Sequence, residues 1–181
     1  MAIDLFLIML LAGGFLLGFF RGAVRQLTSI GAWLISFLLA AHLAGPLGGW
    51  LVEQAPSYSH EYASFLAFGS GFVLLLTAGA LLFQVAGANV ALTRHEPLDG
   101  VIGGLLGMLL LLLVATSLVV ILDSYFRMSG SPGTAEFQVL RDAHQATEGS
   151  TIANVLRQTF VPLLGGLLGP ILPAELRAVM T

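Results

Sequence analysis

Four stretches of the chain are apolar over the length that a membrane-spanning helix requires. About 20 helical residues cross the hydrocarbon core of a bilayer. The runs that meet this requirement are 3–20, 27–44, 65–88 and 101–122. The pattern therefore predicts four transmembrane helices within a domain that covers residues 1–126.

Residues 127–181 form a tail of different composition. The segment 123–133 (DSYFRMSGSPG) has the serine, proline and glycine content of a loop, and 134–148 are polar enough for a short helix in water. In 149–173, Ser150 or Thr151 is a candidate N-cap, and apolar residues follow at helical spacing until Pro162 and later glycines interrupt them. A helix in the membrane interface, or one on the mouth of the bundle, is favoured over a fifth span.

The composition supports a chain whose main solvent is lipid. Of its 181 residues 57% are hydrophobic and 9% are charged, whereas soluble domains carry about 25% charged residues. We therefore expect an all-α membrane protein with four transmembrane helices and a C-terminal extracytoplasmic or interfacial helical tail. The net charge of -3 excludes a nucleic-acid partner, and the absence of cysteine excludes disulfides and thiolate metal sites.

Arginine marks one side of the membrane. Arg21 and Arg25 lie in the first connection and Arg94 in the third, while the second connection carries Glu53 and Glu61 and no arginine. Short loops rich in arginine stay in the cytoplasm, so both termini are expected outside. Arg21 and Arg25 are interpreted as topology determinants or ligands of lipid headgroups, with a docking site for a cytoplasmic partner as the alternative.

Small residues recur four positions apart near the end of the first apolar run and at the start of the fourth. These helix-packing candidates are Gly14, Gly18, Gly22, Gly100, Gly103, Gly104 and Gly107. Small residues at this spacing let helix backbones approach closely in lipid. Both groups fall toward the cytoplasmic side, so the first and fourth helices are candidates to meet there. Packing within one chain and packing between chains both remain open.

Polar residues recur every seventh position on the third run. Ser70, Thr77 and Gln84 therefore share one helix face. Hydrogen bonds between helices are the favoured interpretation. The alternative is a polar lining for a small oligomeric channel or transporter.

Three aspartates lie at the ends of the apolar runs. Asp4 and Asp99 each lie at the start of a helix, where a carboxylate can cap free backbone N–H groups and oppose the helix dipole. Asp123 follows the fourth run, where the dipole disfavours a carboxylate, and Arg127 one turn later is its expected partner.

Sequence patterns of catalysis are absent. The chain has no GxSxG, HExxH or Walker sequence, and its four histidines are dispersed. We therefore predict no catalytic residues, no metal and no cofactor, and expect that the protein is not an enzyme.

Two ordered blocks resemble the colicin V production protein family. The first is Asp4, Gly18, Arg21-Gly22, Val24-Arg25, Ser29 and Trp33, and the second is Asp99, Gly103 and Gly107. The charged residues that match the family pattern are Asp4, Arg21, Arg25 and Asp99. The chain departs from the pattern at Gly100, Leu110 and Leu111, where family members often carry basic groups or an Arg-Gly pair. The likeness covers about residues 3–126.

The resemblance implies a bacterial cytoplasmic (inner) membrane protein linked to export of the toxin colicin V and to envelope integrity. Our leading hypothesis is a non-enzymatic accessory protein that contacts the lipid bilayer and either a second copy of itself or an envelope or export membrane protein. The glycine faces would carry these contacts. The channel lined by Ser70, Thr77 and Gln84 is the rival hypothesis, and an anchor for a separate periplasmic protein is a third.

Overall fold

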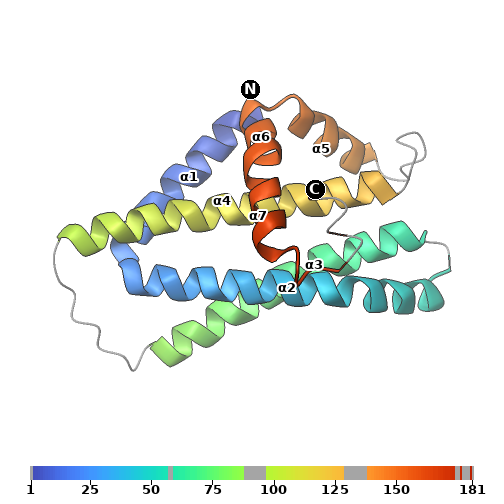
Figure 1. Cartoon of the computed structure of the whole chain (residues 1–181), viewed down its shortest axis with the longest axis horizontal. Helices are drawn as coiled ribbons and strands as arrows, with labels where there is room; N and C mark the ends of the chain where they lie inside the picture. The colour runs from blue at the N-terminus through green and yellow to red at the C-terminus, as the bar shows by residue number, and fades with distance from the viewer. Residues whose placement is uncertain are drawn as a thin grey trace.

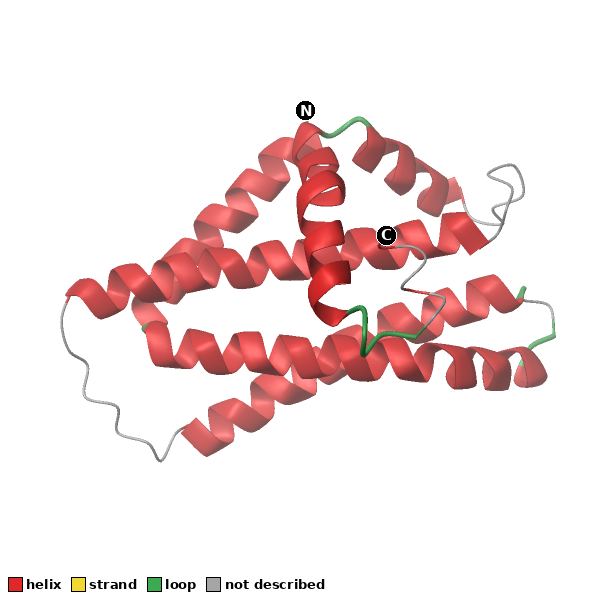
Figure 2. Ribbon diagram, in the orientation of Figure 1, coloured by secondary structure: helices red, strands yellow, loops and turns green. Residues whose placement is uncertain are grey.

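The computed structural model describes residues 2–56, 59–87, 97–128 and 138–173, together with Leu176 and Met180. Its elements in chain order are α1 (Ala2–Arg21), α2 (Ala23–Gln54), α3 (His60–Gly87), α4 (Pro97–Met128), α5 (Gln138–Glu148), α6 (Thr151–Val155), the π-helix η1 (Leu156–Phe160) and α7 (Val161–Leu168). Within these ranges the fold contains helices and no strands (Figure 1 and Figure 2), so the all-helical prediction is confirmed.

The helices α1, α2, α3 and α4 are each long and apolar enough to cross a membrane, as expected. They are longer than the apolar runs that predicted them. For example, α2 continues to Gln54 and α4 begins at Pro97. Hydropathy identifies only the part of a helix that suits lipid, whereas backbone hydrogen bonding continues into the polar flanks.

The long helices pack as two pairs joined through α4. One pair is α1 with α4 and the other is α2 with α3, while α4 also contacts both α2 and α3. Helix α1 has little contact with α2, although a single residue, Gly22, separates them. Helix α4 is therefore the centre of the bundle, and α1 lies at its edge.

An aromatic cluster fills the core. Trp33 stacks on Phe37 with ring centroids 5.7 Å apart, and Phe72 meets Phe37 edge-on at 6.0 Å. The tail contributes to the same core, because Leu164 and Leu168 of α7 are buried against these residues. In lipid, which is as apolar as these side chains, such a core stabilises the fold through the van der Waals contacts of close packing.

The tail runs across the bundle. In Figure 1, α6 and α7 lie across α4 and α2 instead of alongside them. Ser150 is the N-cap of α6, as predicted, since its Oγ accepts a hydrogen bond from the N–H of Ala153 at 3.1 Å. In the π-helix, the N–H of Val161 reaches back to the carbonyl of Leu156, and Pro162 follows in the first turn of α7. Among the described residues, only the four long helices qualify as candidate spans.

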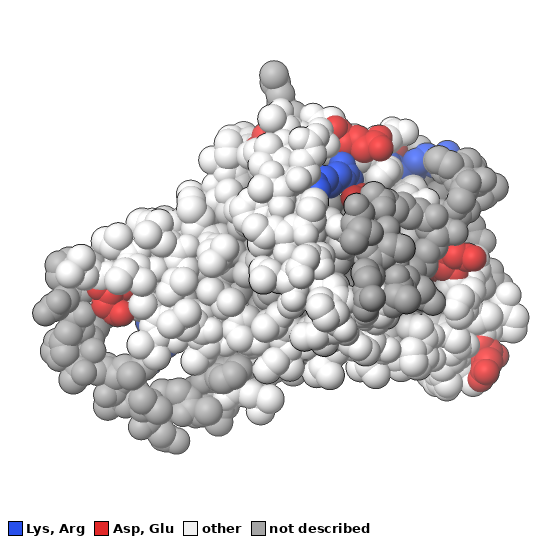
Figure 3. Space-filling model, in the orientation of Figure 1, with Lys and Arg blue, Asp and Glu red and all other residues white. Residues whose placement is uncertain are grey.

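Large apolar side chains cover much of the outer surface. Leu5, Met9, Leu74 and Leu82 are all more than half exposed. On the face in Figure 3, charged side chains gather near the ends of the bundle and beside the tail, and the described surface between them is uncharged. This distribution suits a bundle surrounded by hydrocarbon.

Candidate functional site: glycine contacts and aspartate-capped helix junctions

Glycines of α1 and α4 meet backbone to backbone. A Cβ atom placed on Gly18 would overlap the carbonyl of Gly103, and one on Gly107 would overlap the carbonyl of Gly14. The pairing is antiparallel, since the position on α4 falls as the position on α1 rises. The glycines of α1 and those of α4 therefore contact each other within one chain. This is the geometry expected where small residues let helix backbones approach closely.

The other two glycines of α4 receive aromatic rings from α1. A Cβ on Gly100 would lie 3.1 Å from the ring of Phe19, and one on Gly104 would lie 2.7 Å from the ring of Phe15. The two phenylalanines are one turn apart on α1 and their ring centroids are separated by 6.3 Å. The glycine-lined face of α4 thus takes both the backbone and the rings of α1.

Gly22 joins α1 to α2 and Asp99 holds this junction. The φ of Gly22 is 82°, which lies in the left-handed region that favours glycine. A Cβ atom on Gly22 would overlap the Asp99 carboxylate. Oδ1 of Asp99 accepts a hydrogen bond from the N–H of Ala23, the first residue of α2, at 3.1 Å. The sequence suggests that Asp99 caps the helix it begins; the structure shows it capping α2, a helix that starts 76 residues earlier.

Asp4 caps a distant helix in the same way. Its Oδ1 accepts hydrogen bonds from the N–H of Ile152 at 3.0 Å and from the hydroxyl of Ser150 at 2.8 Å. These groups form the N-terminus of α6, where partial positive charge favours a carboxylate. The start of α1 is thereby fixed to the start of the transverse tail.

Gln26 is a residue that the analysis of the sequence missed. Its side chain is only 2% exposed, and a Cβ on Gly107 would lie 2.6 Å from its Nε2. Among the described residues Oε1 of Gln26 has no hydrogen-bond partner. Its position could have been suspected, because it extends the four-residue spacing of Gly18 and Gly22 into α2.

Arg21 and Arg25 stay at the surface. Arg21 ends α1 and Arg25 lies in the first turn of α2, and both are exposed. Neither forms an ion pair with another described residue.

A charged cluster ties α4 to the tail. Arg157 donates from Nε to Oδ2 of Asp123 at 2.8 Å and from Nη2 to Oδ1 at 2.7 Å, a bidentate pair. The pKa of Arg157 is raised, first of all by this hydrogen-bonded carboxylate. His144 stacks on Phe126 with a centroid separation of 4.1 Å and reaches Glu148 at 3.3 Å. The partner found for Asp123 is thus Arg157 of η1; the side chain of the expected partner, Arg127, lies outside the described part.

Of the proposed polar lining, the structure describes the side chains of Ser70 and Thr77, and these do not line an enclosed passage within the described part of the chain. Ser70 and Thr77 are exposed on α3, and their hydroxyls donate to the carbonyls of Leu66 and Val73 in their own helix. The side chain of Gln84 lies outside the described residues. A hydroxyl bonded to its own helix backbone needs no polar solute, so the channel hypothesis is not favoured.

A hydrogen bond between two side chains also joins α2 to α4. Nε1 of Trp33 donates to Oγ of Ser117 at 3.0 Å, linking α2 to α4 in the core. No group of three histidine, aspartate or glutamate side chains placed to hold a metal ion occurs within the described ranges.

The fold and these junctions define an all-helical polytopic membrane protein. The family model described as colicin V production protein matches residues 3–160, and the chain therefore belongs to that family. The match extends past the likeness seen in the sequence and reaches the end of η1. The match therefore includes Ser150 and Ile152, the two tail residues that bind Asp4, and it also includes Arg157.

Two curated relatives align with most of the chain. The colicin V production protein homolog of Haemophilus influenzae is 25% identical over 138 residues, which cover 76% of this chain and 83% of the relative. The colicin V production protein of Escherichia coli K12 is 27% identical over 139 residues, with the same coverage of each chain. No solved structure matches the chain significantly.

Proposed function

We propose that this chain is a non-enzymatic accessory protein of the bacterial inner membrane that supports toxin export or envelope maintenance by binding a partner membrane protein. The family membership supplies the context, since the relatives are named for production of colicin V. The first and third connections carry arginine and fall on one side of a four-span bundle, which supports a cytoplasmic position for that side. The tail is bound to the start of α1, which supports a position for both termini on the opposite side.

The glycine contacts lie inside the chain, so the partner must bind elsewhere. Helix α1 offers the other face. Leu5, Met9, Leu16 and Phe20 recur at intervals of four, seven and four and are all more than half exposed. Only 11% of the most apolar stretch of α1 is buried, compared with 44% of the corresponding stretch of α4.

The observation that carries the proposal is that α1 is largely exposed and yet fixed at both ends. Asp4 binds the tail at one end, and Gly22 and Asp99 form the junction at the other. A helix held in this way presents its outer face in one orientation, which lowers the entropic cost of binding.

Photo-crosslinking in native membranes tests the proposal. A benzophenone amino acid is placed at Met9 or Leu16 on the outer face, and at Phe15, whose ring packs on Gly104, as the matched control. We expect both outer positions to capture the same envelope or export membrane protein, or a second copy of the chain, while position 15 gives only internal adducts. Adducts with lipid alone at both outer positions would contradict the proposal.

A further inference from the structure

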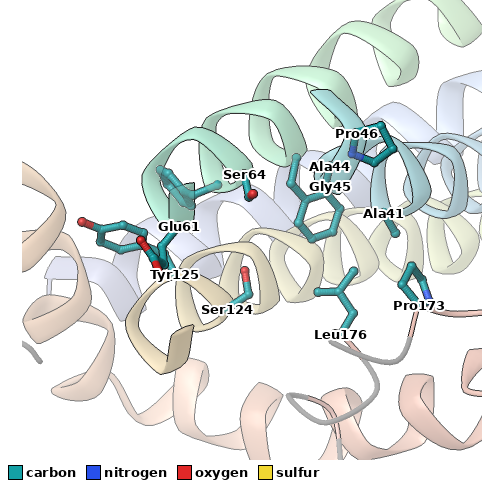
Figure 4. Close-up of a pocket in the computed structure, with 12 residues that line it drawn as sticks. Ala41, Ala44, Gly45, Pro46, Glu61, Ser64, Ser124, Tyr125, Pro173 and Leu176 are labelled. Atoms are coloured by element: carbon teal, nitrogen blue, oxygen red, sulfur yellow. The ribbon is translucent and has the colours of Figure 1, made fainter. Parts of the chain in front are cut away.

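A small cavity opens between the outer ends of the long helices. It has a volume of about 260 Å³ and lies where α2, the start of α3 and the end of α4 meet the C-terminal segment (Figure 4). Pockets for drug-sized ligands measure roughly 300–1,000 Å³. This cavity therefore suits a smaller molecule or one part of a lipid.

The walls are mostly apolar. Ala41 and Ala44 of α2, Phe65 of α3 and Leu176 of the C-terminal segment line the cavity, and Tyr125 of α4 presents its ring. Leu176 is only 4% exposed, and its side chain closes one side of the cavity. A hydrocarbon body would replace water here favourably.

Two polar groups on one face of α3 have no hydrogen-bond or ion-pair partner among the described residues. Glu61 is half-buried and lines the cavity, and its carboxylate makes no hydrogen bond or ion pair with any described residue. Ser64, three residues later, also lines the cavity, and its hydroxyl has no hydrogen-bond partner in the described part of the chain. Glu61 also lies in the first turn of α3, where the helix dipole favours an acid. The helix dipole explains why a negatively charged residue is favoured at this position. It does not explain why the Glu61 carboxylate lines an apolar cavity with no partner among the described residues.

We infer that this cavity binds a primary organic ammonium whose short hydrocarbon body lies against the apolar walls. The ammonium has three donors and no acceptor, and Glu61 and Ser64 offer acceptors one helical turn apart. Such a group occurs in the headgroup of phosphatidylethanolamine and in soluble alkylamines. The inference does not depend on the accessory role proposed above.

The test uses the whole chain in phosphatidylcholine nanodiscs, with hexylammonium as the probe and hexanol as its uncharged counterpart. Binding is followed by saturation-transfer difference NMR, with empty nanodiscs subtracted. We expect saturable binding of hexylammonium that weakens by about tenfold or more in Glu61→Gln, the loss expected for one charge-assisted hydrogen bond. Glu53→Gln is the matched control, since Glu53 is exposed near the same end and does not line the cavity.

A second variant guards against a fold defect in the first. Ala44→Leu fills the cavity from α2 and leaves Glu61 in place, and we expect it to lose the probe as well. The near-ultraviolet circular dichroism of the aromatic side chains, including the buried Trp33, reports whether each variant keeps its tertiary packing. Equal binding of hexylammonium and hexanol, or full affinity in a folded Glu61→Gln or Ala44→Leu protein, would overturn the inference.

A lipid arm identifies the source of the ammonium. If phosphatidylethanolamine is the ligand, nanodiscs that contain it will lower the apparent affinity for hexylammonium in the wild type, and the cavity is a lipid site. If the affinity is unchanged, the cavity takes soluble amines. Both results require the saturable, Glu61-dependent binding described above.

Discussion

Asp4 and Ile152 are 148 positions apart, and yet the carboxylate of Asp4 accepts the backbone N–H of Ile152 at 3.0 Å. The contact makes the first turn of α1 part of the N-terminal cap of α6. Because α7 continues from this helix into the aromatic core, the position of α1 and the packing of the tail depend on one another.

Removal of this cap should loosen the tail. Asp4→Ala deletes the acceptor for Ile152 and Ser150, and loss of a cap costs about 1 kcal/mol. We expect tryptic cleavage after Arg157 to become roughly fivefold faster, since the open population grows by that factor. Asp142→Ala, at an exposed position of α5, is the control. An unchanged cleavage rate in Asp4→Ala would show that the cap does not hold the tail.

The ion pair between Asp123 and Arg157 should contribute more to the free energy of unfolding than the Asp4 cap does. Their side chains are 16% and 19% exposed, and removal of one partner from a buried pair costs about 3 kcal/mol or more. The remaining exposure of the two side chains reduces that cost, so Arg157→Met should lower the unfolding free energy by about 2 kcal/mol. Thermal unfolding in detergent, followed through the tryptophan signal, measures the effect.

A double mutant separates the pair from the packing of the arginine stem. Asp123→Asn combined with Arg157→Met should be more stable than Arg157→Met alone, because no half-buried charge remains unpaired. If the two substitutions were simply additive, the ion pair would not be the source of the stability. Arg25→Met is the control, because Arg25 is exposed, and it should change the midpoint temperature of unfolding little.

The junction of Gly22 and Asp99 makes a different prediction. Gly22→Ala faces both a left-handed φ, which costs about 1 kcal/mol or more, and overlap with the Asp99 carboxylate. In an Asp99→Ala background only the backbone cost remains, so the effect of Gly22→Ala should shrink. Gly31→Ala is the matched control, since a Cβ there meets nothing within 4 Å, and it should stabilise α2 slightly. Equal effects of Gly22→Ala in both backgrounds would contradict the close contact with Asp99.

Local patterns in the sequence were sufficient to predict the long helices and the cap at Ser150. Each of these depends on residues within a few turns of one another. The partners of Asp4, Asp99 and Asp123 depend instead on which helices become neighbours after folding. Proximity in the sequence therefore suggested that the first two aspartates cap their own helices and that Arg127 binds the third.

The sequence also does not predict what surrounds a given face of a helix. The seven-residue spacing of Ser70 and Thr77 correctly identifies one face of α3, but it does not say whether that face meets another helix. In the structure the two hydroxyls bond to their own backbone at the surface. Gln26, by contrast, is buried against Gly107 of α4, a contact that the sequence around Gln26 does not predict.

The central claim is that α1 and α4 touch backbone to backbone within one chain, and that function requires this contact. The most direct measurement compares Gly18→Leu with Gly13→Leu for complementation of an envelope defect at equal amounts of inserted protein. A side chain at position 18 must displace the carbonyl of Gly103, whereas one at position 13 meets nothing within 4 Å. We predict that Gly18→Leu fails to complement and Gly13→Leu succeeds. Normal complementation by Gly18→Leu would contradict the account.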